Sequence, residues 1–224
     1  MPTKYGDDFI VASYLKWVES AGGRGVRIPY NATKDELDNG THFPLWGTCL
    51  GFEWLVQLQA QNKSILDNVD ADNVSSTLLF HQENKNPFTA NFHFLGILEK
   101  HFDDTALLKS FYKKLATSED KQGQTYVAAI EAFDYPIYGV QFHPEKNPYE
   151  IGDDKTGGSM NLVDHSYEAI VTSQAFAHFF IGEARRNNHS FANPEEEKAA
   201  LLLNYELSNR SYPYFESTTV FKLP

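Results

Sequence analysis

The chain has 224 residues, a formal net charge of -11 and 42% hydrophobic residues, which predicts one folded domain over residues 1–224. The acidic balance argues against nucleic acid as a partner, and no apolar run approaches the roughly 18 residues that cross a bilayer. A single cysteine excludes an internal disulfide framework and a metal site built from several cysteines.

The N-terminal part predicts a helix followed by a short strand. Apolar residues recur at helical spacing over 8–21, and Gly22-Gly23 supplies the stop. Residues 25–30 have the composition of a strand, and a capping-box pattern from Thr33 predicts one helical turn.

The stretch 43–55 has the pattern of a strand, a sharp turn and a helix. The turn carries the only cysteine, Cys49, with Gly47 and Gly51 two residues to either side. With 14 glycines in 224 residues, chance gives this flanking pair roughly once in 250 positions. A nucleophile elbow has this pattern: its glycines allow close backbone approach, and the helix N-terminus favours a thiolate. We predict Cys49 as a nucleophile and the Leu50 N–H as an oxyanion donor; the alternative is a buried structural cysteine.

The rest of the chain predicts alternating helices and strands. The helix after the turn spans 50–61 with Phe52, Leu55, Val56 and Leu58 inward. Loops are expected at 62–76 and 146–159. Strands are expected at 77–80, 88–98, 124–133, 137–142 and from 205, and helices at 103–117, 164–188 and from 193.

His143-Pro144-Glu145 directly follows the strand expected at 137–142. A thiol nucleophile needs a base, and the base needs a group that orients it. His143 ends a strand and has a carboxylate two residues later, so it is the preferred base, with Glu145 as its orienting partner. His93 and Glu53 are further candidates, although His93 taken alone is better explained as a structural histidine, and a helix-dipole role explains Glu53 equally well.

These motifs resemble the class I glutamine amidotransferase-like superfamily, and most closely its γ-glutamyl hydrolase branch. Residues 43–53 are similar to the nucleophile motif of that branch, and residues 138–150 to its His-Pro-Glu segment. The resemblance implies an α/β fold: a doubly wound, mainly parallel sheet flanked by helices, of flavodoxin-like type.

The same resemblance implies a cysteine hydrolase that cleaves the γ-glutamyl bonds of folylpoly-γ-glutamates through a thioester. Cys49 would be the nucleophile, His143 the base and acid, and Glu145 the orienting group. Glu53 and His93 would bind substrate, the Leu50 N–H would serve the oxyanion, and no cofactor or metal is implied. A poly-γ-glutamyl folate is the expected partner, and a homodimer is left open.

Two departures of the sequence from the family pattern concern the strands of its sheet. No strand is expected before the helix at 8–21, and residues 31–42 contain no strand ending in Pro-Gly-Gly, which in the family supplies a second oxyanion donor. The resemblance is thus to a shortened member, and a catalytically impaired or binding-only relative is the alternative function. An amidotransferase glutaminase is less favoured, because Glu53 stands where amidotransferases usually carry glutamine.

The resemblance also implies a lysosomal or extracellular, glycosylated protein, although the N-terminal residues lack the apolar segment of a signal peptide. Asn-x-Ser/Thr sequons exceed the roughly two expected by chance. They begin at Asn31, Asn39, Asn62, Asn73, Asn188 and Asn209.

Overall fold

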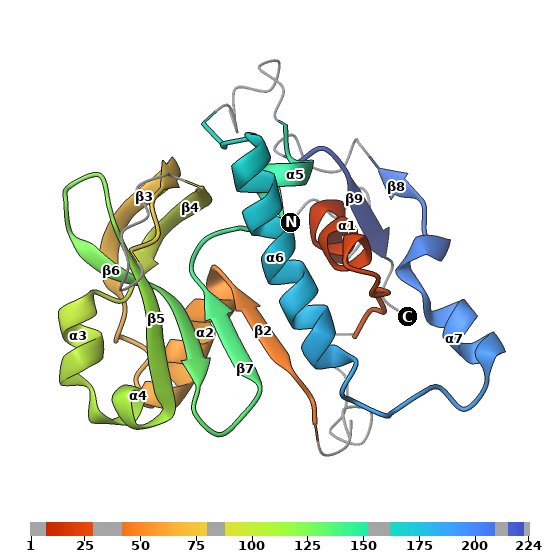
Figure 1. The fold of residues 1–224 in the computed structure, drawn as a ribbon, viewed down its shortest axis with the longest axis horizontal. Coiled ribbons are helices and arrows are strands. Elements are labelled where there is room, and N and C mark those ends of the chain that lie inside the picture. Colours follow the sequence, from red (N-terminus) through yellow and green to blue (C-terminus); the bar gives the residue numbers. More distant parts are fainter. Residues whose placement is uncertain (1–7, 29–41, 80–87, 152–161, 209–214, 222–224) are drawn as a thin grey trace. The chain divides into compact units, whose positions relative to one another are not determined.

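The computed structural model describes residues 8–28, 42–79, 88–151, 162–208 and 215–221, which form two compact units (Figure 1). The first unit contains residues 1–43, 148–161 and 174–224, and the second contains residues 44–147 and 162–173. All six predicted site residues belong to the second unit. Among the described residues, no helix is both long enough and apolar enough to span a membrane.

A four-stranded mixed sheet organises the second unit. In spatial order its strands are β2 (Leu45–Thr48), β7 (Ile137–Val140), β6 (Thr125–Ala132) and β5 (Tyr112–Glu119). Only β2 and β7 pair in parallel, while β7–β6 and β6–β5 pair antiparallel. The α/β class is confirmed, but the described sheet is mixed rather than mainly parallel. The reason is that short turns join β5, β6 and β7, and a short turn can only reverse the chain.

A second, two-stranded antiparallel sheet consists of β3 (Asp67–Ser76) and β4 (Thr89–Gly96). The strand expected at 88–98 is confirmed, whereas the loop expected at 62–76 is wrong. Val69 and Ala71 are buried and alternate with more exposed neighbours along β3. This alternation was hidden in the sequence because most residues of β3 are polar and are stabilised by pairing with β4.

The helix expected at 103–117 is wrong. The chain instead forms α3 (Glu99–Asp104) and α4 (Ala106–Phe111), separated at the extended residue Thr105, and then enters β5. Pairing with β6 overrides the helical spacing of the apolar residues there, since local propensity is only a weak preference. A helical turn, α5 (Lys146–Tyr149), also replaces the start of the loop expected at 146–159.

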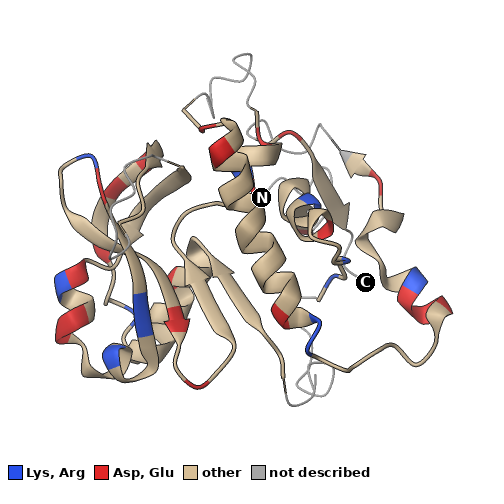
Figure 2. Cartoon of the chain, viewed as in Figure 1, with Lys and Arg blue, Asp and Glu red and all other residues tan. Residues whose placement is uncertain are grey.

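In the second unit α3, β3 and β5 each carry several charged residues, whereas β2 and β7 carry none (Figure 2). Lys114 on β5 donates to Glu99 at 2.6 Å and to Asp103 at 2.9 Å, both on α3. These ion pairs attach α3 to the sheet at its solvent side. Because β2 and β7 carry no acidic or basic side chain, Cys49, His143 and Glu145 come from the segments that follow these two strands.

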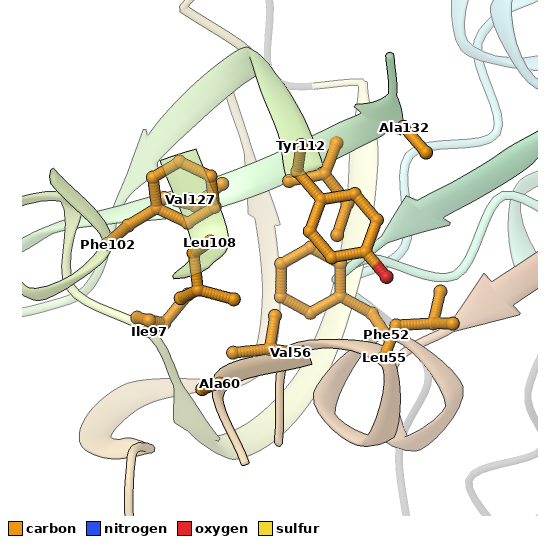
Figure 3. Packing of buried hydrophobic residues seen from close by; sticks show 11 residues of the cluster. Phe52, Leu55, Val56, Ala60, Ile97, Phe102, Leu108, Tyr112, Val127 and Ala132 are labelled. Atoms are coloured by element: carbon orange, nitrogen blue, oxygen red, sulfur yellow. The ribbon is translucent and has the colours of Figure 1, made fainter. Parts of the chain in front are cut away.

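The hydrophobic core of the second unit lies between the mixed sheet and helices α2 (Leu50–Ala60), α3 and α4 (Figure 3). Phe52 and Val56 of α2 are fully buried there, and Leu55 is nearly so. The predicted inward position of Leu58 is wrong, because its side chain is 75% exposed on the same helical face as Leu50. The core residues are Phe52, Leu55, Val56, Ala60, Ile97, Phe102, Leu108, Tyr112, Val127, Ile130 and Ala132.

The first unit contains a three-stranded antiparallel sheet in the order β1 (Asp8–Val11), β9 (Thr218–Phe221), β8 (Leu207–Ser208). The helix expected at 8–21 therefore begins late, as α1 (Ala12–Ser20), and a strand does precede it. Backbone pairing of β1 with β9 supplies the hydrogen bonds that fix these residues as a strand. The strand expected from residue 205 is confirmed by β8 and β9.

The C-terminal helices agree with the sequence. Helix α6 (Tyr167–Ala184) corresponds to the helix expected at 164–188. Helix α7 (Pro194–Ala200) begins after Asn193, whose side chain accepts from the Glu196 N–H at 2.9 Å, and a short 3-10 helix, η3 (Leu202–Asn204), follows. The strands expected at 25–30 and 77–80 are single bridges at Val26 and Leu79 in the described residues, and the helical turn expected from Thr33 lies outside them.

The two glycines that flank Cys49 have different structural roles. A Cβ at Gly47 would lie 2.8 Å from the backbone of Gly51 and 2.8 Å from the Leu55 side chain. A Cβ at Gly51 would meet nothing within 4 Å. Close backbone approach therefore requires glycine at Gly47 only, and the steric reason expected for Gly51 is wrong.

Gly47→Ala is expected to lower the free energy of unfolding by about 1–3 kcal/mol, because the added methyl group has no room. Gly51→Ala is the matched control and should be neutral or stabilising by up to about 1 kcal/mol, since alanine favours the helix. Urea unfolding of both variants measures the difference. Equal destabilisation by the two substitutions would contradict this description of the turn.

Candidate active site

Cys49 occupies a strained turn between β2 and α2. Its backbone has φ 51° and ψ -105°, a conformation uncommon for a residue with a side chain. The Cys49 N–H donates to the Val140 carbonyl at 2.9 Å, and the Cys49 carbonyl accepts from the Glu53 N–H at 2.9 Å. The turn is thus tied to the end of β7 on one side and to the first turn of α2 on the other.

Three hydrogen bonds position the His143 segment that follows β7. The His143 N–H donates to the Ala90 carbonyl of β4 at 2.8 Å, and the Lys146 N–H donates to the His143 carbonyl at 3.3 Å. The hydroxyl of the buried Ser173, on α6, donates to the carbonyl of Pro144. The segment is therefore fixed to a strand and to a helix, as well as to its own turn.

The structure brings Cys49, His143 and Glu145 together. His143 Nδ1 lies 2.8 Å from Glu145 Oε1, and the His143 side chain is also hydrogen-bonded to Cys49. Because Nδ1 faces Glu145, Nε2 is the nitrogen left for the thiol. Burial alone would lower the pKa of His143, but the Glu145 carboxylate and the Cys49 side chain raise that pKa to about 9.

Glu145 is a fully buried carboxylate. Burial tends to raise its pKa, but the charge and hydrogen bond of His143 and the charge of Lys146 lower it below the ordinary value. Its second oxygen, Oε2, makes no hydrogen bond within the described part of the chain. The carboxylate is therefore directed at His143 through a single oxygen.

Glu53 and His93 also lie in the electrostatic range of His143. Glu53 Oε1 accepts from Gln141 Nε2 at 3.0 Å; burial raises the pKa of Glu53, while this hydrogen bond and the charge of His143 lower it. Burial lowers the pKa of His93 to about 4, against a hydrogen bond with the Leu95 carbonyl at 2.8 Å and in concert with the charge of His143. His93 is accordingly neutral at neutral pH.

The Leu50 N–H is the first of α2, where helical N–H groups have no partner within the helix. The segment in which a second oxyanion donor was sought, residues 31–42, falls outside the described residues except for His42. Within the described ranges, no group of three or more His, Cys, Asp or Glu residues could hold a metal ion.

The sequence reasoning missed Gln141, Lys146 and Ser173. Gln141 precedes His143 by two residues, so strand alternation could have placed it near the site. Ser173 lies on a distant helix, and no local signal connects it to Pro144.

Comparison with known proteins identifies the family. Residues 30–156, more than half of the chain, match the model of the class I glutamine amidotransferases. The chain is 35% identical over 272 aligned residues to γ-glutamyl hydrolase B of Dictyostelium discoideum, covering 96% of this chain and 76% of that protein. It is 31% identical to γ-glutamyl hydrolase of Homo sapiens, covering 90% of this chain and 79% of that protein. The chain belongs to the γ-glutamyl hydrolase family.

Membership of the γ-glutamyl hydrolase family confirms the family prediction and the class I glutamine amidotransferase-like α/β fold. It also confirms an enzyme of this type as the general function. The alignment of 272 residues with the Dictyostelium protein is longer than the 224 residues of this chain. That relative therefore carries segments with no counterpart here, as expected for a shortened member.

Glu145→Gln is expected to lower the pKa of His143 from about 9 toward or below its ordinary 6.5, because burial then acts without the carboxylate. The raised pKa stabilises the fold fully below pH 6.5, and this contribution is lost as the pH rises through about 9. NMR titration of the His143 ring measures the pKa of His143 in the unaltered chain and in Glu145→Gln. An equal pKa in the two proteins would contradict the assignment of the raised value to Glu145.

Proposed function

We propose that this chain is a cysteine hydrolase that cleaves the γ-glutamyl bonds of folylpoly-γ-glutamates through a thioester intermediate. The observation that carries this proposal is the contact of Cys49, in its strained turn, with His143, whose other ring nitrogen meets Glu145. A nucleophile, a base within hydrogen-bond reach and an orienting group are the parts that thiol catalysis requires.

In the first step, the Cys49 thiol proton passes to His143 Nε2, and the sulfur attacks the carbonyl carbon of the γ-glutamyl amide. The carbonyl electrons form an oxyanion, and we assign the Leu50 N–H as a donor to it. His143 then gives its proton to the amide nitrogen, the C–N bond breaks, and the amine product leaves. The acyl group stays on Cys49 as a thioester.

In the second step, His143 takes a proton from water, whose oxygen attacks the thioester carbon. The C–S bond breaks, the carboxylic acid product leaves, and the proton returns to the Cys49 sulfur. A pKa of His143 raised to about 9 favours the protonated ring, which suits its acid role in the first step. Glu145 holds the proton on Nδ1 throughout and stabilises the imidazolium.

We assign Glu53 and His93 to the substrate side of the same site. Both are buried polar side chains, and the charge of His143 acts on each of them. His93 is neutral at neutral pH and so adds no charge to the site, while burial raises the pKa of Glu53. Glu53 is also held by Gln141, which fixes where its carboxyl group points.

A catalytically impaired or binding-only relative is the second candidate. The observation that favours it is the presence, in the aligned Dictyostelium protein, of segments that this chain lacks. Loss of one oxyanion donor costs about 100- to 1,000-fold in turnover while leaving substrate binding nearly unchanged. Under this alternative, the chain would bind its substrate with ordinary affinity but turn it over slowly.

Cys49→Ser is expected to reduce the cleavage of pteroylpenta-γ-glutamate by at least about 1,000-fold, because the hydroxyl is a much weaker nucleophile. Chromatography of the pteroylglutamate products measures the rate, and the same substrate with α-linked glutamates should not be cleaved. Lys109→Met, an exposed substitution on α4, is the control and should keep the original rate.

Cleavage by the Cys49→Ser variant at the rate of the unaltered chain would overturn the thiol mechanism. If the unaltered chain binds the substrate but cleaves it no faster than Cys49→Ser, the binding-only alternative is the function.

A further inference from the structure

Lys146 is a buried lysine directly after Glu145, with 4% of its surface exposed. Lysine is almost never buried unless it is paired, since removing an ammonium group from water is costly. It begins the short helix α5, and its N–H closes the turn that contains His143 and Glu145. This turn therefore fixes the Cα position of Lys146 relative to His143 and Glu145.

The ring of Phe92 contacts both Lys146 and His143. Lys146 Nζ lies 5.0 Å from the centroid of the Phe92 ring, within the range of a cation–π interaction. The same ring meets His143 edge to face, at 6.0 Å between centroids and 75° between planes. The His143 N–H donates to the carbonyl of Ala90, two residues before Phe92 on β4. This backbone hydrogen bond fixes the position of His143 relative to the strand that carries Phe92.

Lys146 also acts on Glu145. The buried Oε2 of Glu145 makes no hydrogen bond in the described residues, so its negative charge needs compensation from nearby charges. After burial, which opposes ionisation, the charges of His143 and then Lys146 favour the carboxylate form and lower the pKa of Glu145. His143 exchanges protons during the proposed reaction, whereas Lys146 takes no part in its proton transfers.

We propose that Lys146 is a positioning residue, whose buried ammonium, held over Phe92, keeps Glu145 as the anion that orients His143 and sets the pH range in which Cys49 reacts. This inference rests on the proposed function of the same site. Lys146 would supply a positive charge beside Glu145 that belongs to none of the three residues Cys49, His143 and Glu145.

The direction of the pH effect follows from charge alone. The titratable groups that act on His143 in the described residues are Cys49 from the elbow, Glu53 from α2, His93 from β4 and Glu145. The charge of Lys146 lowers the pKa of Glu145, so its removal should raise the pH above which Glu145 is ionised. Glu145 can hold His143 as the imidazolium beside Cys49 only when it is ionised, so the acidic limb of the pH dependence should move to higher pH.

The test is the rate at which iodoacetamide alkylates Cys49, the only cysteine of the chain, measured across the pH range. Lys146→Met and Lys146→Gln should each raise the pH of half-maximal rate by at least about half a unit. Lys146→Arg keeps the charge and should restore the original midpoint, and Lys109→Met should leave it unchanged. The acidic limb of the kcat/KM profile for γ-glutamyl cleavage should move in the same direction.

A midpoint that is the same in Lys146→Met, Lys146→Gln and the unaltered chain would overturn the proposal and leave Lys146 a packing residue. If both neutral variants fail to fold by circular dichroism, Lys146→His decides, because an imidazole loses its charge near neutral pH whereas the lysine ammonium does not. An upward shift in that variant supports the proposal, and an unchanged midpoint overturns it. Alkylation needs no substrate, so this result is independent of whether the chain hydrolyses γ-glutamyl bonds.

Discussion

The parallel pairing of β2 with β7 is the constraint on which the site depends. The register opposes Gly47 to Gly139 and Thr48 to Val140, so both strands end at the same edge of the sheet. Cys49 follows one strand, and the segment leading to His143 follows the other. The two opposed glycines allow this closeness, since a Cβ at Gly139 would lie 3.0 Å from the Phe52 ring and one at Gly47 would meet the elbow backbone. The backbone pairing of β2 with β7 thus brings the positions of nucleophile and base together.

A layer of buried polar groups surrounds this pair. The Gln141–Glu53 hydrogen bond, the neutral His93 and the Lys146–Glu145 charges all lie in regions that a purely structural protein would fill with apolar side chains. Burying these groups is costly, and the cost is offset by the α2 core packing shown in Figure 3. The same burial strengthens their electrostatic effect on His143, because charges act more strongly away from water.

Sequence alone predicted the parts of this site that local patterns encode. The turn at Cys49, the helix after it and the His143–Glu145 pair all carry short signals of spacing and residue type. The sequence-based prediction failed where pairing between strands decides the local structure. The helical spacing predicted over 103–117 gives way to β5 from Tyr112 because β6 lies beside it, and polar residues 67–76 form β3 because β4 pairs with them. Ser173 and Lys146 belong to the same category, since their contacts with the catalytic segment appear only in three dimensions.

The central claim is that the Cys49 sulfur forms a covalent acyl intermediate, and intact-protein mass measurement during a single turnover tests it most directly. Excess enzyme would be mixed with pteroyldi-γ-glutamate and quenched in acid over a time course that covers the whole turnover. The account predicts a transient mass increase equal to the pteroyl-γ-glutamyl acyl group, located on the peptide that contains Cys49, which rises and then decays as the acid product appears. A turnover that completes while the mass of the chain stays unchanged at every time would contradict it.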